Sequence, residues 1–121
     1  MKFREINLES GTRLLLGKNA VNNDELMKEF VGQKNIIMHT AAPGSPFCVI
    51  ENLGKRKDKK QAAVICAKFS QDWRDHKQDV LINVFNGKCI SKEKRMKTGT
   101  WKVRKCKVIK VKKEDIKKWQ E

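Results

Sequence analysis

The sequence of 121 residues lacks several features that would restrict the class of protein. It contains no run of 18 or more apolar residues, so we expect no membrane-spanning helix. Its first five residues lack the apolar segment of a secretory signal, which favours a cytoplasmic location. It also lacks internal repeats and low-complexity linkers, and we therefore expect a single domain over residues 1–121.

Motifs for three kinds of chemistry are absent as well. Neither the phosphate-binding pattern G-x-x-x-x-G-K-S/T nor the nucleophile pattern G-x-S-x-G occurs. The four cysteines are separated by 18, 23 and 17 residues, without a C-x-x-C pair or a nearby histidine that would complete a zinc motif. We therefore expect Cys48, Cys66, Cys89 and Cys106 to be buried apolar side chains, and we expect no metal and no cofactor.

Acidic residues are scarce in the second half of the chain. Residues 1–53 contain six Lys or Arg and six Asp or Glu, whereas residues 54–121 contain 22 basic and eight acidic residues, so the second half carries the whole net charge of +14. A charge this one-sided favours a polyanionic partner over a surface that only keeps the protein in solution. Nucleic acid fits better than a membrane, because no basic amphipathic helix with a wide apolar face is present.

Hydrophobic patterning predicts an α+β fold, in which a mixed or largely antiparallel sheet packs against one main helix and shorter helices. Strands are expected at residues 3–8, 12–16, 36–40, 47–51, 79–85, 88–91 and 101–111, and helices at 24–30, 59–77 and 114–119.

Local signals predict how several of these elements begin and end. Residues 9–11 form a short turn between the first two strands, which gives an opening hairpin. Asn22 or Asn23 is expected to cap the first helix, and Asp58 the second. Asn86-Gly87 predicts a hairpin between the strands on either side of it. The alternation of apolar residues changes phase twice within residues 101–111, which predicts a bulge or a break there.

Candidate binding residues fall into two groups. Two basic loops, residues 54–60 and 92–99, are expected to meet on one side of the sheet and form a groove for a phosphate backbone. The candidate contacts in these loops are Lys55, Arg56, Lys57, Lys59, Lys60, Lys94, Arg95 and Lys97. Polar residues at the ends of strands are expected to gather in a pocket at one end of the sheet: Asn19, Asn23, His39 and Ser45. Lys18, next to Asn19 in the sequence, is a further candidate contact to nucleic acid.

The chemistry of His39 leaves other functions open. One alternative is an enzyme acting on RNA or a nucleotide, with His39 as acid or base. We expect no enzymatic activity, because no third group is present to orient the imidazole. A histidine that only holds a loop in the core explains the residue equally well. The other alternative is a module that binds DNA or an acidic protein, since both are polyanions.

Four short motifs occur in order along the first half of the chain: Gly17-Lys18-Asn19-Ala20, Asn23-Asp24-Glu25-Leu26, the strand ending in His39, and Pro43-Gly44-Ser45. Their order resembles the RNA-binding domain of the NFACT proteins, whose patterns are G-x-N-A, N-D-x-L, W-x-H-A and P-G-S-H-V. Further on, an alanine-containing helix and Lys97-Thr98-Gly99 resemble the family's alanine-rich helix and basic glycine-containing loop.

This resemblance implies a non-catalytic RNA-binding module in its stand-alone, single-domain form. It also implies that tRNA or rRNA is the partner, and that the context is translation, with the ribosome and its quality control. Two departures concern the pocket. Pro46 stands where the family usually has a second histidine, and Met38 stands close to its usual aromatic residue.

Overall fold

A six-stranded antiparallel sheet with the order β1-β2-β4-β3-β5-β8 forms the centre of the computed structural model, which describes residues 2–52 and 54–120. The strands are β1 (Arg4–Asn7), β2 (Arg13–Leu16), β3 (Ile36–Thr40), β4 (Cys48–Ile50), β5 (Val80–Asn86), β6 (Ile90–Ser91), β7 (Lys102–Val103) and β8 (Lys107–Val111). The helices are α1 (Ala20–Phe30), α2 (Arg56–Lys68), α3 (Gln71–His76) and α4 (Lys113–Lys118), with a 3₁₀ turn, η1, at Gly87–Cys89. The predicted α+β class is confirmed.

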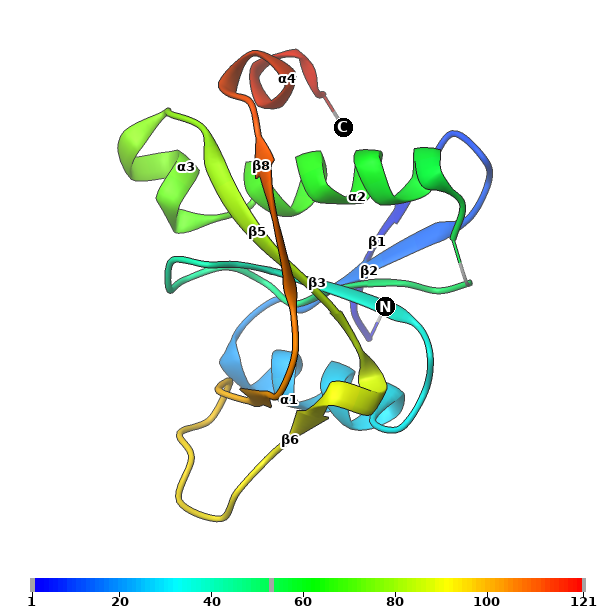
Figure 1. The fold of residues 1–121 in the computed structure, drawn as a ribbon, viewed down its shortest axis with the longest axis vertical. Helices are drawn as coiled ribbons and strands as arrows, with labels where there is room; N and C mark the ends of the chain where they lie inside the picture. Colours follow the sequence, from blue (N-terminus) through cyan, green and yellow to red (C-terminus); the bar gives the residue numbers. More distant parts are fainter. Residues whose placement is uncertain (1, 53, 121) are drawn as a thin grey trace.

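Other secondary-structure elements cover both faces of the central sheet (Figure 1). Helices α2, α3 and α4 pack on one face, where Leu14 and Leu16 of β2 point. Helix α1 and the small β6-β7 sheet pack on the other, where Leu15 points. Successive strand residues point to opposite faces, so a strand with three leucines in a row is buried on both sides. No helix in the described part of the chain is long and apolar enough to cross a membrane.

Several local predictions are confirmed. Strands β1 and β2 form the opening hairpin, with Glu5 opposite Leu15, and Gly11 takes a φ of 91° in its turn. The change of phase after residue 101 is a break, since β7 pairs with β6 and β8 pairs with β5. The terminal helix α4 buries Ile116 completely.

The predicted start of the first helix was wrong by one turn. Helix α1 begins at Ala20, and its N-cap is Asn19, whose Oδ1 accepts a hydrogen bond from Asn22 N at 2.9 Å. The side chains of Asn22 and Asn23 do not cap the helix, because they form hydrogen bonds with other segments of the chain. Consequently no carboxylate lies in the first turn of α1, because Asp24 falls in the second.

The basic segment 54–60 was also misassigned. Helix α2 begins at Arg56, so most of this segment is helical. Asp58 does stabilise the start of the helix, because its Oδ2 accepts from Lys55 N at 2.9 Å from the third helical position. The predicted long helix is divided at Ser70, whose Oγ accepts from Trp73 N at 3.1 Å and caps α3.

The hairpin predicted at Asn86-Gly87 does not form, because β6 leaves the main sheet and pairs with β7. Gly87 lies against the end of α1 instead, where its carbonyl accepts from Gly32 N at 2.8 Å. A Cβ at Gly87 would come within 1.8 Å of the Phe30 carbonyl oxygen, so only glycine allows this approach.

The cysteine prediction is correct for half of the set. Cys48 and Cys66 are buried, whereas Cys89 is half-buried and Cys106 is exposed. Cys106 lies in the break between β7 and β8. Within the described residues, no group of three or more His, Cys, Asp or Glu is placed to hold a metal.

The close packing at Gly87 gives a first prediction. Gly87→Ala should lower the free energy of unfolding by about 2 kcal/mol, because the added methyl group has to displace backbone atoms of α1. Urea unfolding followed by tryptophan fluorescence measures this change. Lys88→Ala, at an exposed neighbouring side chain, should leave the stability within about 0.5 kcal/mol. Equal stability of the two variants would contradict the packing argument.

Candidate functional site

A cleft of about 590 Å³ opens where the carboxyl ends of β2 and β3 meet the amino end of α1. The loop after β3 and the loop before β7 complete its walls. All four residues predicted for the pocket line it, Asn19, Asn23, His39 and Ser45, and the candidate contact Lys18 lines it as well. We refer to this site as the cleft. The described residues that line it include no Asp or Glu.

Three of the predicted polar side chains build the walls of the cleft. Asn19 caps α1, as described above. The Oδ1 of Asn23 accepts from Phe47 N at 3.1 Å, and Ser45 Oγ accepts from Thr40 N at 3.0 Å. Asn23 and Ser45 are each no more than 9% exposed. Their hydrogen bonds satisfy buried backbone N–H groups that would otherwise cost free energy, so these residues fix the loop after β3 in place.

The approach of Asn23 to the chain explains Gly17. A Cβ at Gly17 would lie 1.8 Å from Asn23 Oδ1, so any side chain at position 17 would displace the amide that holds Phe47. Gly17 and Asn23 therefore act as one packing unit.

His39 presents a stacked, neutral ring. Its centroid lies 4.5 Å from that of Phe47, and its Nδ1 lies 2.9 Å from the Thr40 carbonyl oxygen, to which the Nδ1–H donates. Burial lowers the pKa of His39, while hydrogen bonds to the backbone of Thr40 and Ser45 act against this shift without reversing it. The imidazole is therefore neutral at pH 7, and it offers a hydrogen-bonding ring rather than a positive charge.

Positive potential in the cleft comes from other groups. The amino end of α1 faces it, and the first turn of that helix carries no carboxylate to offset the helix dipole. Lys18 and Arg4 also line the cleft, and the Arg4 guanidinium lies 4.8 Å from the centroid of the Phe69 ring. Sequence reasoning missed Arg4 and Phe69, since nothing in the sequence separates them from ordinary strand and helix residues.

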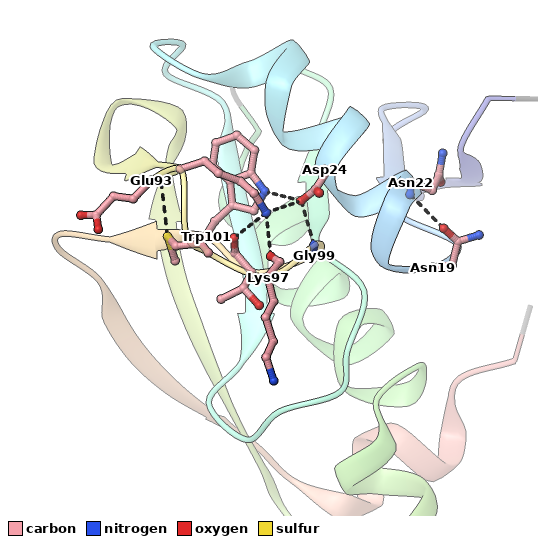
Figure 2. A network of polar contacts seen from close by, with 10 residues as sticks. Asn19, Asn22, Asp24, Glu93, Lys97, Gly99 and Trp101 are labelled. Atoms are coloured by element: carbon pink, nitrogen blue, oxygen red, sulfur yellow. Dashed lines mark hydrogen bonds and ion pairs between the residues drawn. The ribbon is translucent and has the colours of Figure 1, made fainter.

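The loop at the mouth of the cleft is held by one carboxylate (Figure 2). Asp24 Oδ1 accepts hydrogen bonds from Lys92 Nζ at 3.0 Å, Gly99 N at 2.9 Å and Trp101 Nε1 at 2.8 Å. Lys92 Nζ also donates to the Lys97 and Thr100 carbonyl oxygens, which closes the loop on itself. We refer to these contacts of Asp24 as the Asp24 clamp.

The hydrogen bonds of the Asp24 clamp favour the ionised form of the Asp24 carboxylate. Burial raises the pKa of Asp24, but the hydrogen bonds from Trp101, Lys92 and Gly99 outweigh it, so the pKa is lower than usual. The clamp brings Gly99 so close to α1 that a Cβ there would lie 2.9 Å from Ala20 Cβ. Sequence reasoning assigned Asp24 only to the helix dipole, because its partners are 68 to 77 residues away.

The two basic segments do not share one side of the sheet, contrary to the prediction. Lys94, Arg95 and Lys97 are exposed on the loop between β6 and β7, beside the cleft and on the α1 side of the sheet. The other set belongs to α2 and the residue before it, on the opposite face. That set comprises Lys55, Arg56, Lys57, Lys59 and Lys60. The sheet therefore separates them, and no single groove holds both.

One family model matches most of the chain, and two known proteins are similar to it. The family described as "NFACT protein RNA binding domain" matches residues 2–105. A stretch of 61 residues is 33% identical to the archaeal Rqc2 homolog aRqcH of Methanocaldococcus jannaschii, covering 50% of this chain and only 9% of that relative. The C-terminal part of the fibronectin/fibrinogen-binding protein of Streptococcus suis superposes with a TM-score of 0.80 and 28% identity, over 95% of this chain and 48% of that one.

The Asp24 clamp predicts a dependence of stability on pH. Because the pKa of Asp24 is lower in the folded state, the unfolded state binds more protons, and stability decreases as the pH is lowered. The contribution is complete above the usual Asp pKa of about 3.9 and is lost as pH falls through the folded value. Wild type should therefore exceed Asp24→Asn in stability at pH 6, and the difference should shrink below about pH 4. Urea unfolding at both pH values measures it; a constant difference would contradict the clamp.

Proposed function

The chain belongs to the family of the NFACT protein RNA-binding domain, and on that premise we propose that it is a non-catalytic module that binds tRNA or rRNA in translation or ribosome quality control. The chain spans 9% of its curated relative and about half of the similar solved structure, so the activities of those longer proteins are proposals for this one. The observation that carries the proposal is the cleft: a positive site with no carboxylate among the described residues that line it, at a helix amino end, beside an exposed basic loop.

Each part of the cleft suits one part of an RNA strand. Backbone N–H groups and the dipole at the start of α1 favour a phosphate, and the charges of Lys18 and Arg4 add to this. The half-buried ring of His39, which packs against the buried ring of Phe47, gives a flat surface with a polar edge, which suits a base exposed in a loop or at an end of an RNA. Lys94, Arg95 and Lys97 are placed to contact the phosphates on either side.

Two features argue for binding rather than catalysis. The Nδ1 of His39 bonds to a backbone carbonyl rather than to a carboxylate, so no charged group in the described part of the chain orients or activates the ring. Ser45 uses its hydroxyl to hold Thr40, which leaves it unsuited to act as a nucleophile. Pro46 lines the cleft at the position of the family's second histidine, so the cleft offers one imidazole.

Charge removal on the loop beside the cleft tests this arrangement. Lys94→Ala/Arg95→Ala/Lys97→Ala should weaken tRNA binding several-fold and lower the slope of log K against log salt by about one for each phosphate that is no longer neutralised. Fluorescence anisotropy over a salt series measures both quantities. The matched control is Lys112→Ala/Lys117→Ala/Lys118→Ala, which removes the same charge from exposed residues at the other end of the molecule. Equal effects of the two triple variants would remove the loop from the interface.

The identity of the ligand needs a separate experiment. The protein is crosslinked to RNA in its native host and purified, and the attached RNA is sequenced. We expect enrichment of tRNA or of one rRNA region over its cellular abundance, reduced by the loop variant and retained by the matched control. RNA recovered in proportion to abundance would contradict specific binding. Recovery of DNA or of an acidic protein in place of RNA would favour the alternative class of partner.

A further inference from the structure

A second groove, of about 660 Å³, lies on the α2 face of the sheet and shares no lining residue with the cleft. Its floor is the α2 side of β3, β5 and β8, and its walls are the first turns of α2 and the chain before β8. Among the described residues that line it, none is acidic and six are basic: Lys34, Arg56, Lys59, Lys60, Lys105 and Lys107. We refer to this site as the basic groove.

The arrangement of the cations follows from helix and strand geometry. Arg56, Lys59 and Lys60 have the spacing i, i+3, i+4, so they share the side of α2 that faces the groove. Lys107 shares a face of β8 with Ile109, and both line the groove. Two rows of positive charge thus run along a floor that is apolar.

The positive charges of the basic groove are not neutralised internally. None of the six forms an ion pair within residues 2–52 and 54–120. Asp58 is the only acidic residue of α2, and it is 2% exposed. Its carboxylate already accepts hydrogen bonds from Ser10 Oγ and Lys55 N. No acidic residue occurs between Arg95 and Lys113. Like charges held together in one groove repel, and a polyanion relieves that repulsion.

The floor of the groove indicates what kind of polyanion fits. Ile36 and Val84 are half-buried, and Ile109 is 37% exposed, so aliphatic surface remains open between the two rows of charge. A strand of unpaired nucleotides presents apolar base faces between charged phosphates, which matches this pattern. A double helix presents mainly phosphates and would leave the floor uncovered. An acidic peptide carries charge but few flat apolar groups.

We propose that the basic groove is a second RNA-binding site, which holds a single-stranded segment by its phosphates while bases cover the aliphatic floor. The basic groove and the cleft share no lining residue, so one domain can hold two RNA segments at once. The inference shares with the proposed function only the class of ligand, and either site can exist without the other.

Cysteine chemistry gives a local probe of this groove. Cys106 is exposed and lines the groove, whereas Cys48 and Cys66 are buried. Modification of the full chain by N-ethylmaleimide, followed by mass spectrometry, reports on each thiol separately. A saturating oligouridylate of twelve nucleotides should slow the modification of Cys106 at least fivefold. The buried pair serves as an internal reference that should stay unmodified while the protein is folded.

Paired variants localise the effect. Lys59→Ala/Lys107→Ala should abolish most of the protection and lower the salt slope for oligouridylate by about 1.4, at about 0.7 for each phosphate neutralised on a single strand. The matched control is Lys57→Ala/Lys110→Ala, which removes two charges from the same helix and strand at positions that do not line the groove. We expect the control, and the loop variant at the cleft, to keep the protection of Cys106.

The outcomes separate the two sites. If tRNA binding depends on the loop variant but oligouridylate never protects Cys106, the basic groove is not an RNA site and the cleft proposal stands. If Cys106 is protected and only the groove variant removes the protection, the groove is supported even where the loop variant has no effect on tRNA. The inference would be overturned if the two double-lysine variants lost the protection of Cys106 equally. It would also be overturned if a twelve-residue polyglutamate protected Cys106 as well as oligouridylate does.

Discussion

Burial of the central sheet on both faces is the constraint on which the rest of the structure depends. In β2, β3 and β4, side chains pointing either way are at most 8% exposed at Leu14, Leu15, Ile37, Met38 and Val49. Strands of this kind need a cover on each side, and the chain supplies α2 with α3 and α4 on one face and α1 with the β6-β7 sheet on the other. The charged loops and helix ends are carried to opposite faces by the elements that provide this cover. Two separate positive sites follow from the same requirement that builds the core.

The cleft illustrates how polar residues can shape a site through hydrogen bonds within the protein. Asn19, Asn23 and Ser45 all use side-chain oxygens to accept from backbone N–H groups, and Gly17 leaves the space that Asn23 needs. Removing one acceptor would leave a buried donor unsatisfied, which costs about 1–3 kcal/mol. The groups that remain to meet a ligand are the His39 ring, cations at the rim and the amino end of α1. A mutation in the polar motif would therefore act on binding through the position of the loop.

The Asp24 clamp applies the same principle over a long range in sequence. One carboxylate oxygen receives an ammonium, an indole N–H and a backbone N–H from a single loop, and thereby fixes that loop against α1. Hydrogen bonds to a charged acceptor are the stronger kind, at about 1.5–3 kcal/mol each. The loop carries the exposed cations beside the cleft, so its position determines where positive charge is presented. The net charge of +14 is therefore concentrated at particular parts of the surface rather than spread evenly over it.

Local sequence determined much of this protein: the α+β class, the opening hairpin, the apolar strands, the break before β8, the terminal helix and the pocket residues at the ends of β2 and β3. These follow from short-range periodicity and turn chemistry. Tertiary structure alone decided the features that depend on contacts between residues far apart in the chain. Asn19 caps α1 because Asn22 and Asn23 bond other segments. Gly87 meets the end of α1 in place of making a hairpin, and Asp24 finds donors up to 77 residues away. The two basic segments lie apart because the sheet between them needs cover on both faces, a constraint that no local pattern records.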